Sequence, residues 1–153
     1  SVSRFAITFR TPDGFSDVER FKELVQAGSE DIKVEIIDNF QWNPIGLVSK
    51  RHERMLEGNL NYFIRQGRVN IYKGTSGDFK SDRIKNDVLL TFIDGDHEYS
   101  GCRKDIELGI ALNSDFICGD DFHFSGVKKA VYELLDEEKL EVVNNTLWIY
   151  DNR

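Results

Sequence analysis

The sequence predicts an α/β fold built around a mostly parallel β-sheet. Segments typical of strands and of helices alternate along the 153 residues, which is the pattern of βαβ units. Two apolar runs, residues 89–93 and 115–119, end abruptly in acidic residues. Residues 140–150 read as a hairpin around Asn144-Asn145, which would add an antiparallel strand to the sheet.

The composition indicates one soluble globular domain that spans residues 1–153. A formal net charge of −7 disfavours nucleic acid as a partner, because such binding needs a basic face. No apolar stretch approaches the ~20 residues that span a bilayer, and we see no signal-peptide pattern at the N-terminus. Cys102 and Cys118 are expected to be buried free thiols in a reducing compartment, and we therefore expect a cytoplasmic protein.

The first third of the chain contains two predicted strands. Residues 4–9 form the first strand, and the Pro-Asp-Gly sequence within residues 11–15 predicts a turn. Ser16 and Glu19 form a capping box, which predicts that an amphipathic helix begins there. Residues 33–38 form the second strand, which ends in a carboxylate.

The middle of the chain is expected to hold a helix, two strands and a glycine-rich loop. The helix is predicted over residues 45–64, the strands over 68–72 and 87–93, and the loop over 73–78. The side chains expected on the buried side of this helix are Leu47, Val48, Met55, Leu56, Leu60 and Phe63.

The last third is expected to hold two helices, a strand and the hairpin. One helix runs from about Tyr99 to Leu112, and its predicted buried stripe consists of Cys102, Ile106, Gly109 and Ile110. Residues 115–119 form the strand. The second helix is marked by apolar residues at helical spacing: Val127, Ala130, Val131, Leu134 and Leu135.

Four aspartates follow the two apolar strands: Asp94, Asp96, Asp120 and Asp121. In open α/β sheets, ligands bind beyond the carboxyl ends of the strands. Carboxylates gathered there repel one another unless a cation is present, and Mg²⁺ binds through a few carboxylates together with water and substrate oxygens. The pattern therefore favours a divalent-metal site, such as one for Mg²⁺. The alternative is that these acids are helix caps, turn formers and solvated charges.

Single residues near the strand ends have more than one reading. His97, three residues after Asp94, could accept a proton from a substrate hydroxyl, ligate a metal or serve only as a hydrogen-bonded loop residue. Asp38 follows Gly14 by 24 residues, a spacing at which nucleotide-binding folds place an acid on the ribose, although many strands end in Asp. Asp13-Gly14 could let the backbone approach a ligand, but an ordinary turn is favoured.

Three motifs give the chain a family resemblance. They are Phe-Ile-Asp-Gly-Asp-His-Glu-Tyr at residues 92–99, Gly-Asp-Asp-Phe at 119–122, and Ser-Gly-Val-Lys-Lys-Ala-Val at 125–131. Together they resemble class I S-adenosylmethionine-dependent methyltransferases. More narrowly, they are similar to the branch with macrocin-type sugar O-methyltransferases and cephalosporin-hydroxylase-like proteins. The resemblance implies a Rossmann-like three-layer sandwich whose seven-stranded sheet is mostly parallel, with an antiparallel strand at the C-terminus.

The resemblance also implies roles for individual residues. Asp94, Asp120 and Asp121 match a divalent-metal site, and Asp94 with His97 matches the catalytic pair, with His97 as general base. The positions that match the S-adenosylmethionine site are Asp13, Gly14, Asp38, Ser76 and Asp94.

The expected function is metal-assisted O-methylation of a small-molecule or sugar hydroxyl. The first loop contains only Gly14, whereas the family loop is richer in glycine. The alternative is therefore a degenerate, non-catalytic binding module that has lost the methyl-donor site. Hydrolysis on the same acids is a third reading. A small-molecule substrate is the expected partner, and a homo-oligomer is possible.

Overall fold

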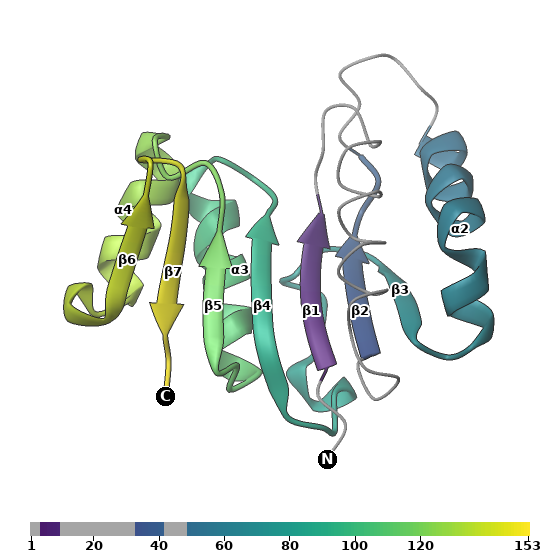
Figure 1. Cartoon of the computed structure of the whole chain (residues 1–153). Helices are drawn as coiled ribbons and strands as arrows, with labels where there is room; N and C mark the ends of the chain where they lie inside the picture. The colour runs from purple at the N-terminus through teal and green to yellow at the C-terminus, as the bar shows by residue number, and fades with distance from the viewer. Residues whose placement is uncertain (1–3, 10–32, 42–48) are drawn as a thin grey trace.

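The computed structural model describes residues 4–9, 33–41 and 49–153 (Figure 1). The strands of this part form one sheet in the order β3-β2-β1-β4-β5-β7-β6. The strands are β1 (Arg4–Phe9), β2 (Lys33–Asp38), β3 (Val69–Lys73), β4 (Val88–Asp94), β5 (Phe116–Gly119), β6 (Leu140–Val143) and β7 (Leu147–Asp151). The helices are α2 (Ser49–Arg65), α3 (Tyr99–Ala111) and α4 (Ser125–Leu134), with short 3₁₀ turns η1 (Ser81–Arg83) and η2 (Glu137–Lys139).

The sheet combines parallel and antiparallel pairs. Strands β3, β2, β1, β4 and β5 pair in parallel, whereas β7 pairs antiparallel with both β5 and β6. The chain order changes direction between β1 and β4, which is the switch point where open α/β sheets bind ligands. The expected α/β, Rossmann-like architecture is therefore confirmed.

Helices cover both faces of the sheet, as the side-chain alternation of β2 shows. Ile36 packs in a buried cluster with Leu60 of α2, whereas Ile37 packs in another with Leu108 of α3. Successive side chains of a strand point to opposite faces, so α2 and α3 lie on opposite sides. This arrangement gives the three layers that the resemblance implies.

The largest core lies between the sheet and the pair of helices α3 and α4. Trp148 of β7 is fully buried there, together with Ile106 of α3, Ile117 of β5 and Val131 of α4. The loop between β6 and β7 is closed by Asn144 and Asn145, whose φ angles are +52° and +57°. Two left-handed residues are what a tight hairpin turn requires, so the predicted Asn-Asn turn is confirmed.

Two predicted core residues are instead exposed. Met55 is 38% exposed, because the side of α2 that faces the sheet carries Leu56, Leu60 and Phe63, and Met55 lies about 100° off that stripe. Ile110 of α3 is 40% exposed. The second buried side of α3 is formed by three residues at i, i+3 and i+7 that the apolar pattern did not select: Asp105, Leu108 and Leu112.

Several sequence predictions fall outside the described residues. These are the capping box at Ser16 and its helix, the Asp13-Gly14 turn, and the first residues of the predicted helix over 45–64. Within the described residues, strand bounds agree with the predictions to within one residue, and no helix is both long and apolar enough to cross a membrane.

We expect Leu60→Ala to lower the free energy of unfolding by about 2–5 kcal/mol, because it leaves a cavity in the core beneath α2. Met55→Ala on the same helix is the matched control, with a smaller loss of less than about 1 kcal/mol, since its side chain is 38% exposed. Urea unfolding followed by circular dichroism measures both. Equal losses for the two variants would contradict the packing of α2 described above.

Candidate functional site

The pairing of β4 with β5 brings the acid-rich segments to one edge. Ile93 lies opposite Gly119, so the acids that follow the two strands emerge side by side. The Asp120 N–H donates to the Ile93 carbonyl at 3.2 Å, which continues the pairing one residue beyond the strand. Only glycine fits at position 119, because a Cβ would lie 2.6 Å from the Ile93 carbonyl oxygen and 2.7 Å from the Trp148 ring.

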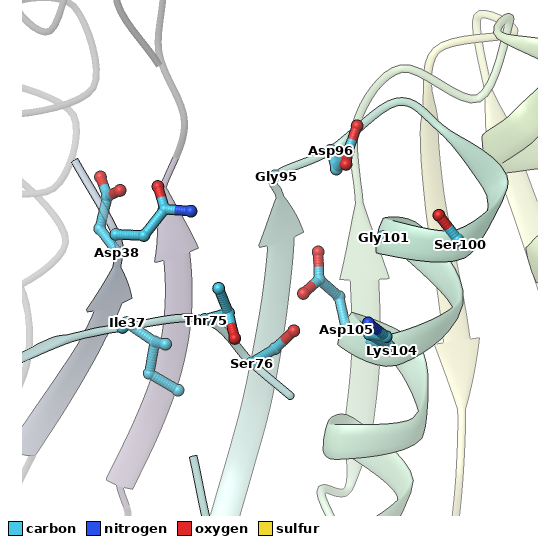
Figure 2. Close-up of a pocket in the computed structure, with 12 residues that line it drawn as sticks. Ile37, Asp38, Thr75, Ser76, Gly95, Asp96, Ser100, Gly101, Lys104 and Asp105 are labelled. Carbon is cyan, nitrogen blue, oxygen red and sulfur yellow. The ribbon is translucent and has the colours of Figure 1, made fainter. Parts of the chain in front are cut away.

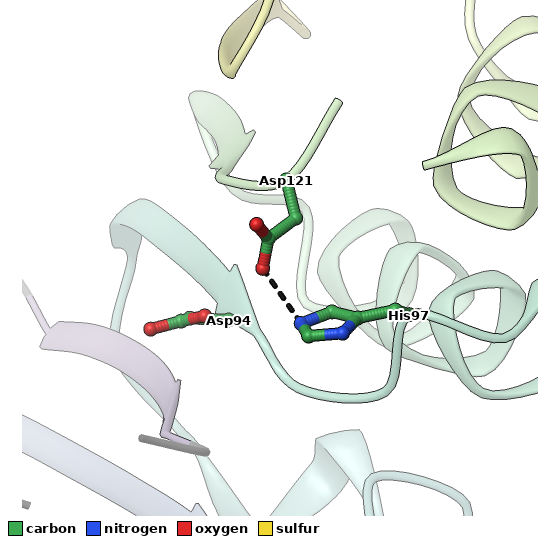
Figure 3. A group of neighbouring side chains, drawn as sticks. All are labelled: Asp94, His97 and Asp121. Atoms are coloured by element: carbon green, nitrogen blue, oxygen red, sulfur yellow. Dashed lines mark ion pairs between the residues drawn. The ribbon is translucent and has the colours of Figure 1, made fainter. Parts of the chain in front are cut away.

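Asp94, His97 and Asp121 form a compact group at this edge, and we refer to them as the triad (Figure 3). One ligand atom of each lies within 4.8 Å of those of the other two. The His97 Nε2 lies 2.6 Å from Asp121 Oδ2. Two carboxylates and an imidazole suit a divalent cation. The side chains are partly or fully exposed, which leaves room for water and substrate oxygens.

The loop after β5 holds the Asp121 side chain in place. Asp121 has a φ of +60°, an unusual conformation for a residue other than glycine. The next residues anchor it: the Phe122 N–H donates to the Thr146 carbonyl, and the Phe124 N–H donates to the Asp121 carbonyl, both at 2.9 Å. Phe122 is itself buried in the main core. A backbone strained beside a potential ligand is typical of functional sites.

The Asp120 carboxylate has partners outside the ligand atoms of the triad. Its Oδ1 accepts a hydrogen bond from the Thr146 hydroxyl, and another from the Asp121 N–H at 2.7 Å. The structure therefore brings Asp94, His97 and Asp121 into the triad and ties the Asp120 carboxylate to the β6–β7 hairpin. Its role as a metal ligand stays a prediction.

A pocket lies next to the triad, beyond the ends of β2, β3 and β4 (Figure 2). Asp38 and Ser76, both predicted to bind the methyl donor, line this one pocket. Asp94 lies in the triad, and the next two residues, Gly95 and Asp96, line the pocket. Asp13 and Gly14 lie outside the described residues.

The wall formed by β2 and β3 is tied together by hydrogen bonds. The Asp38 carboxylate accepts from the Phe40 N–H at 2.8 Å, and the Asp38 carbonyl accepts from the Gly74 N–H at 2.9 Å. The glycine-rich loop is closed by a hydrogen bond between the Thr75 hydroxyl and Asp78 Oδ2 at 2.7 Å. These contacts hold Ser76 and Asp38 on the same side of the pocket.

Sequence reasoning missed the wall that α3 provides. Asp105 projects from α3 toward the pocket and is only 8% exposed (Figure 2). Lys104, Ser100 and Gly101 line the same side. The sequence did contain a signal for Asp105. It is a charged residue three positions after Cys102, on a buried side of the helix.

The pocket acids also affect one of the two buried cysteines. Burial raises the pKa of the Cys102 thiol to about 12, with a further contribution from the negative charges of Asp105 and Asp96. Burial alone raises the pKa of the Cys118 thiol to about 12. Both cysteines are free and buried, as predicted, and thiols of such high pKa are poor nucleophiles.

Comparison with known proteins identifies the fold but no closer relative. No family model matches the chain, and no curated protein matches it. The chain is similar to the apo structure of CalS11, a TDP-rhamnose 3'-O-methyltransferase of calicheamicin biosynthesis, with a TM-score of 0.68 and 9% identity over 97% of this chain and 72% of that one.

Two other solved structures show the same likeness. The cofactor-bound Rv0187 from MTB has a TM-score of 0.66 and 16% identity over 98% of this chain and 72% of that one. A Staphylococcus aureus protein provisionally described as a caffeoyl-CoA O-methyltransferase has a TM-score of 0.63 and 16% identity over 98% of this chain and 76% of that one. The fold is that of class I S-adenosylmethionine-dependent methyltransferases, so the resemblance is confirmed at the level of the fold.

The triad predicts that Asp121→Asn weakens Mn²⁺ binding by about tenfold or more, since a charged ligand is lost. Isothermal titration calorimetry with Mn²⁺ measures the effect, and Asp136→Asn, an exposed cap of η2, is the control. Unchanged affinity in Asp121→Asn would remove this residue from the site. A comparable loss in Asp120→Asn would assign the third predicted acid to the site, whereas no loss would leave its carboxylate as an acceptor for the Thr146 hydroxyl and the Asp121 N–H.

Proposed function

We propose that this chain is an S-adenosylmethionine-dependent methyltransferase that methylates a hydroxyl oxygen of a small molecule or sugar with the help of a divalent cation. The fold supports the proposal. The observation that carries it is the junction at the end of β4, where Asp94 belongs to the triad while Gly95 and Asp96 line the pocket. Because consecutive residues join the triad and the pocket, an acceptor at the triad and a methyl donor in the pocket would lie next to each other.

The pocket residues fit a cationic nucleoside ligand. Asp38, at the end of β2, would accept hydrogen bonds from ribose hydroxyls, and Ser76 would contact the base from the β3 loop. Asp96 and Asp105 would add negative charge that favours a ligand carrying positive charge. S-adenosylmethionine, when bound, supplies the methyl group on its positively charged sulfur.

The triad residues fit the acceptor side of the reaction. Asp94 and Asp121 would hold a divalent cation, which when bound lowers the pKa of a substrate hydroxyl. His97 would accept the hydroxyl proton once Asp121 binds the cation in place of the imidazole Nε2 that it now faces. Its side chain is 42% exposed, so the proton can pass to solvent. The protein would otherwise act by alignment of the two reactants.

A non-catalytic binding module is the second candidate. It is favoured by the sequence of residues 10–16, in which Gly14 is the only glycine, because each glycine is a position at which a ligand can approach the backbone closely. Such a module would keep the triad and its affinity for a divalent cation while binding no methyl donor.

Calorimetric titration of S-adenosylmethionine and S-adenosylhomocysteine tests the proposal. We expect micromolar binding, and Asp38→Asn should weaken it by roughly ten- to a hundredfold, because a charged hydrogen-bond acceptor to the ribose is lost. Asp82→Asn, on the exposed turn η1, should bind like the wild type. Absence of binding in folded protein would favour the non-catalytic module, and equal binding by Asp38→Asn would contradict the assignment of the pocket.

A further inference from the structure

Phe124 is an aromatic residue whose position the hydrophobic core does not explain. Its side chain is 41% exposed, and it belongs to none of the buried clusters of the described residues. Among the described residues, the two aromatic rings that contact Phe124 are both imidazoles. The His97 ring stacks on it with the centroids 4.6 Å apart and the planes inclined by 9°, and the His123 ring lies 4.4 Å away at 39°.

The backbone of Phe124 is tied to the other member of the ion pair. Its N–H donates to the Asp121 carbonyl at 2.9 Å, and its own carbonyl accepts from the Lys128 N–H at 3.0 Å, where α4 begins. Phe124 therefore contacts Asp121 through the main chain and His97 through its ring. One residue connects the two groups that lie 2.6 Å apart in the triad.

The first turn of α4 also packs against the main chain of the His97 loop. A Cβ on Gly126 would lie 2.5 Å from the His97 carbonyl oxygen and 2.7 Å from the Tyr99 nitrogen. Glycine thus allows the helix to approach this loop closely. As a result, α4 contacts the backbone of His97 through Gly126 and the imidazole through Phe124.

This arrangement restricts a side chain that would otherwise move freely. The His97 side chain is 42% exposed, and the χ2 torsion of histidine has a broad energy minimum. A parallel ring fixes the plane of the imidazole, and the pair with Asp121 selects which of the two flips is occupied. Together the two contacts define the plane and the flip of the imidazole, with Nε2 beside Asp121.

We propose that Phe124 is a positioning residue that holds the His97 imidazole toward Asp94 and Asp121. Only the role of the positioned imidazole, as acceptor of the hydroxyl proton, rests on the proposed function. The positioning itself is a property of the free protein.

The test compares Phe124→Leu with Phe124→Tyr, which keeps the ring. In the wild type, NMR of the His97 ring protons should show upfield ring-current shifts and a single rotamer. In Phe124→Leu the ring-current shifts disappear with the ring itself, so the deciding readout is the rotamer, which should become averaged over more than one orientation of the imidazole. Phe124→Tyr should match the wild type in all of these readouts.

Tyr62→Leu is the control, since it removes an exposed ring of α2 on the other face of the sheet and should change none of the readouts. The thermal midpoint of Phe124→Leu should stay near the wild-type value. The inference is overturned if His97 keeps a single rotamer in Phe124→Leu, or if the thermal midpoint falls steeply, which would make the ring a fold-stabilising group. Wild-type protein that binds no Mn²⁺ would refute the metal part of the proposed function, and the NMR comparison would still decide the role of Phe124.

Discussion

The register between β4 and β5 is the constraint on which the site depends. Because Ile93 lies opposite Gly119, the segments that begin at Asp94 and Asp120 leave the sheet next to each other. A shift by one residue would turn every side chain of one strand to the other face. Gly119 fixes the register further, since the Ile93 carbonyl and the Trp148 ring occupy the space of its missing side chain. The triad, the bond between Asp120 and Thr146, and the approach of α4 all follow from this pairing.

The end of β4 separates two kinds of environment. On one side lie Asp94 and the exposed His97, with α4 packed against their loop. On the other side, Gly95 lets the buried Asp105 approach, because a Cβ at that position would lie 2.6 Å from the Asp105 carboxylate. The pocket is lined by β2, the β3 loop and α3 and contains the carboxylates of Asp38, Asp96 and Asp105, whereas no triad residue lines it (Figures 2 and 3). In the proposed function, the pocket would hold the methyl donor and the triad would face the acceptor.

The local features of the fold could be predicted from the sequence, and the contacts between distant segments could not. Strands 4–9 and 33–38 and the Asn144-Asn145 turn follow from residue type and spacing. Met55 and Ile110 were placed wrongly because an apolar residue one step off the buried stripe satisfies the same pattern. Asp105 was missed because the periodicity of a helix was counted on apolar residues alone.

In the functional site too, local features could be predicted from the sequence and contacts between distant segments could not. The acids at the strand ends were recognised from their position, but their partners are far away in the chain. Asp120 is bonded to Thr146, 26 residues later, and His97 pairs with Asp121 across two loops. Spacing along the chain gives no information on which of two adjacent aspartates turns toward the imidazole. That choice is made by the positive φ of Asp121 and the anchoring of its loop.

The most direct test is whether the triad and the pocket are adjacent in solution. The measurement is the paramagnetic relaxation that Mn²⁺ causes in the ¹³C-methyl signal of labelled S-adenosylmethionine bound to the protein, with Mg²⁺ as the diamagnetic reference. We expect strong relaxation of the methyl signal, because the triad and the pocket share the turn that follows β4. Binding of both the cation and S-adenosylmethionine without enhanced relaxation would contradict this adjacency, since the cation would then lie too far from the methyl group to assist its transfer.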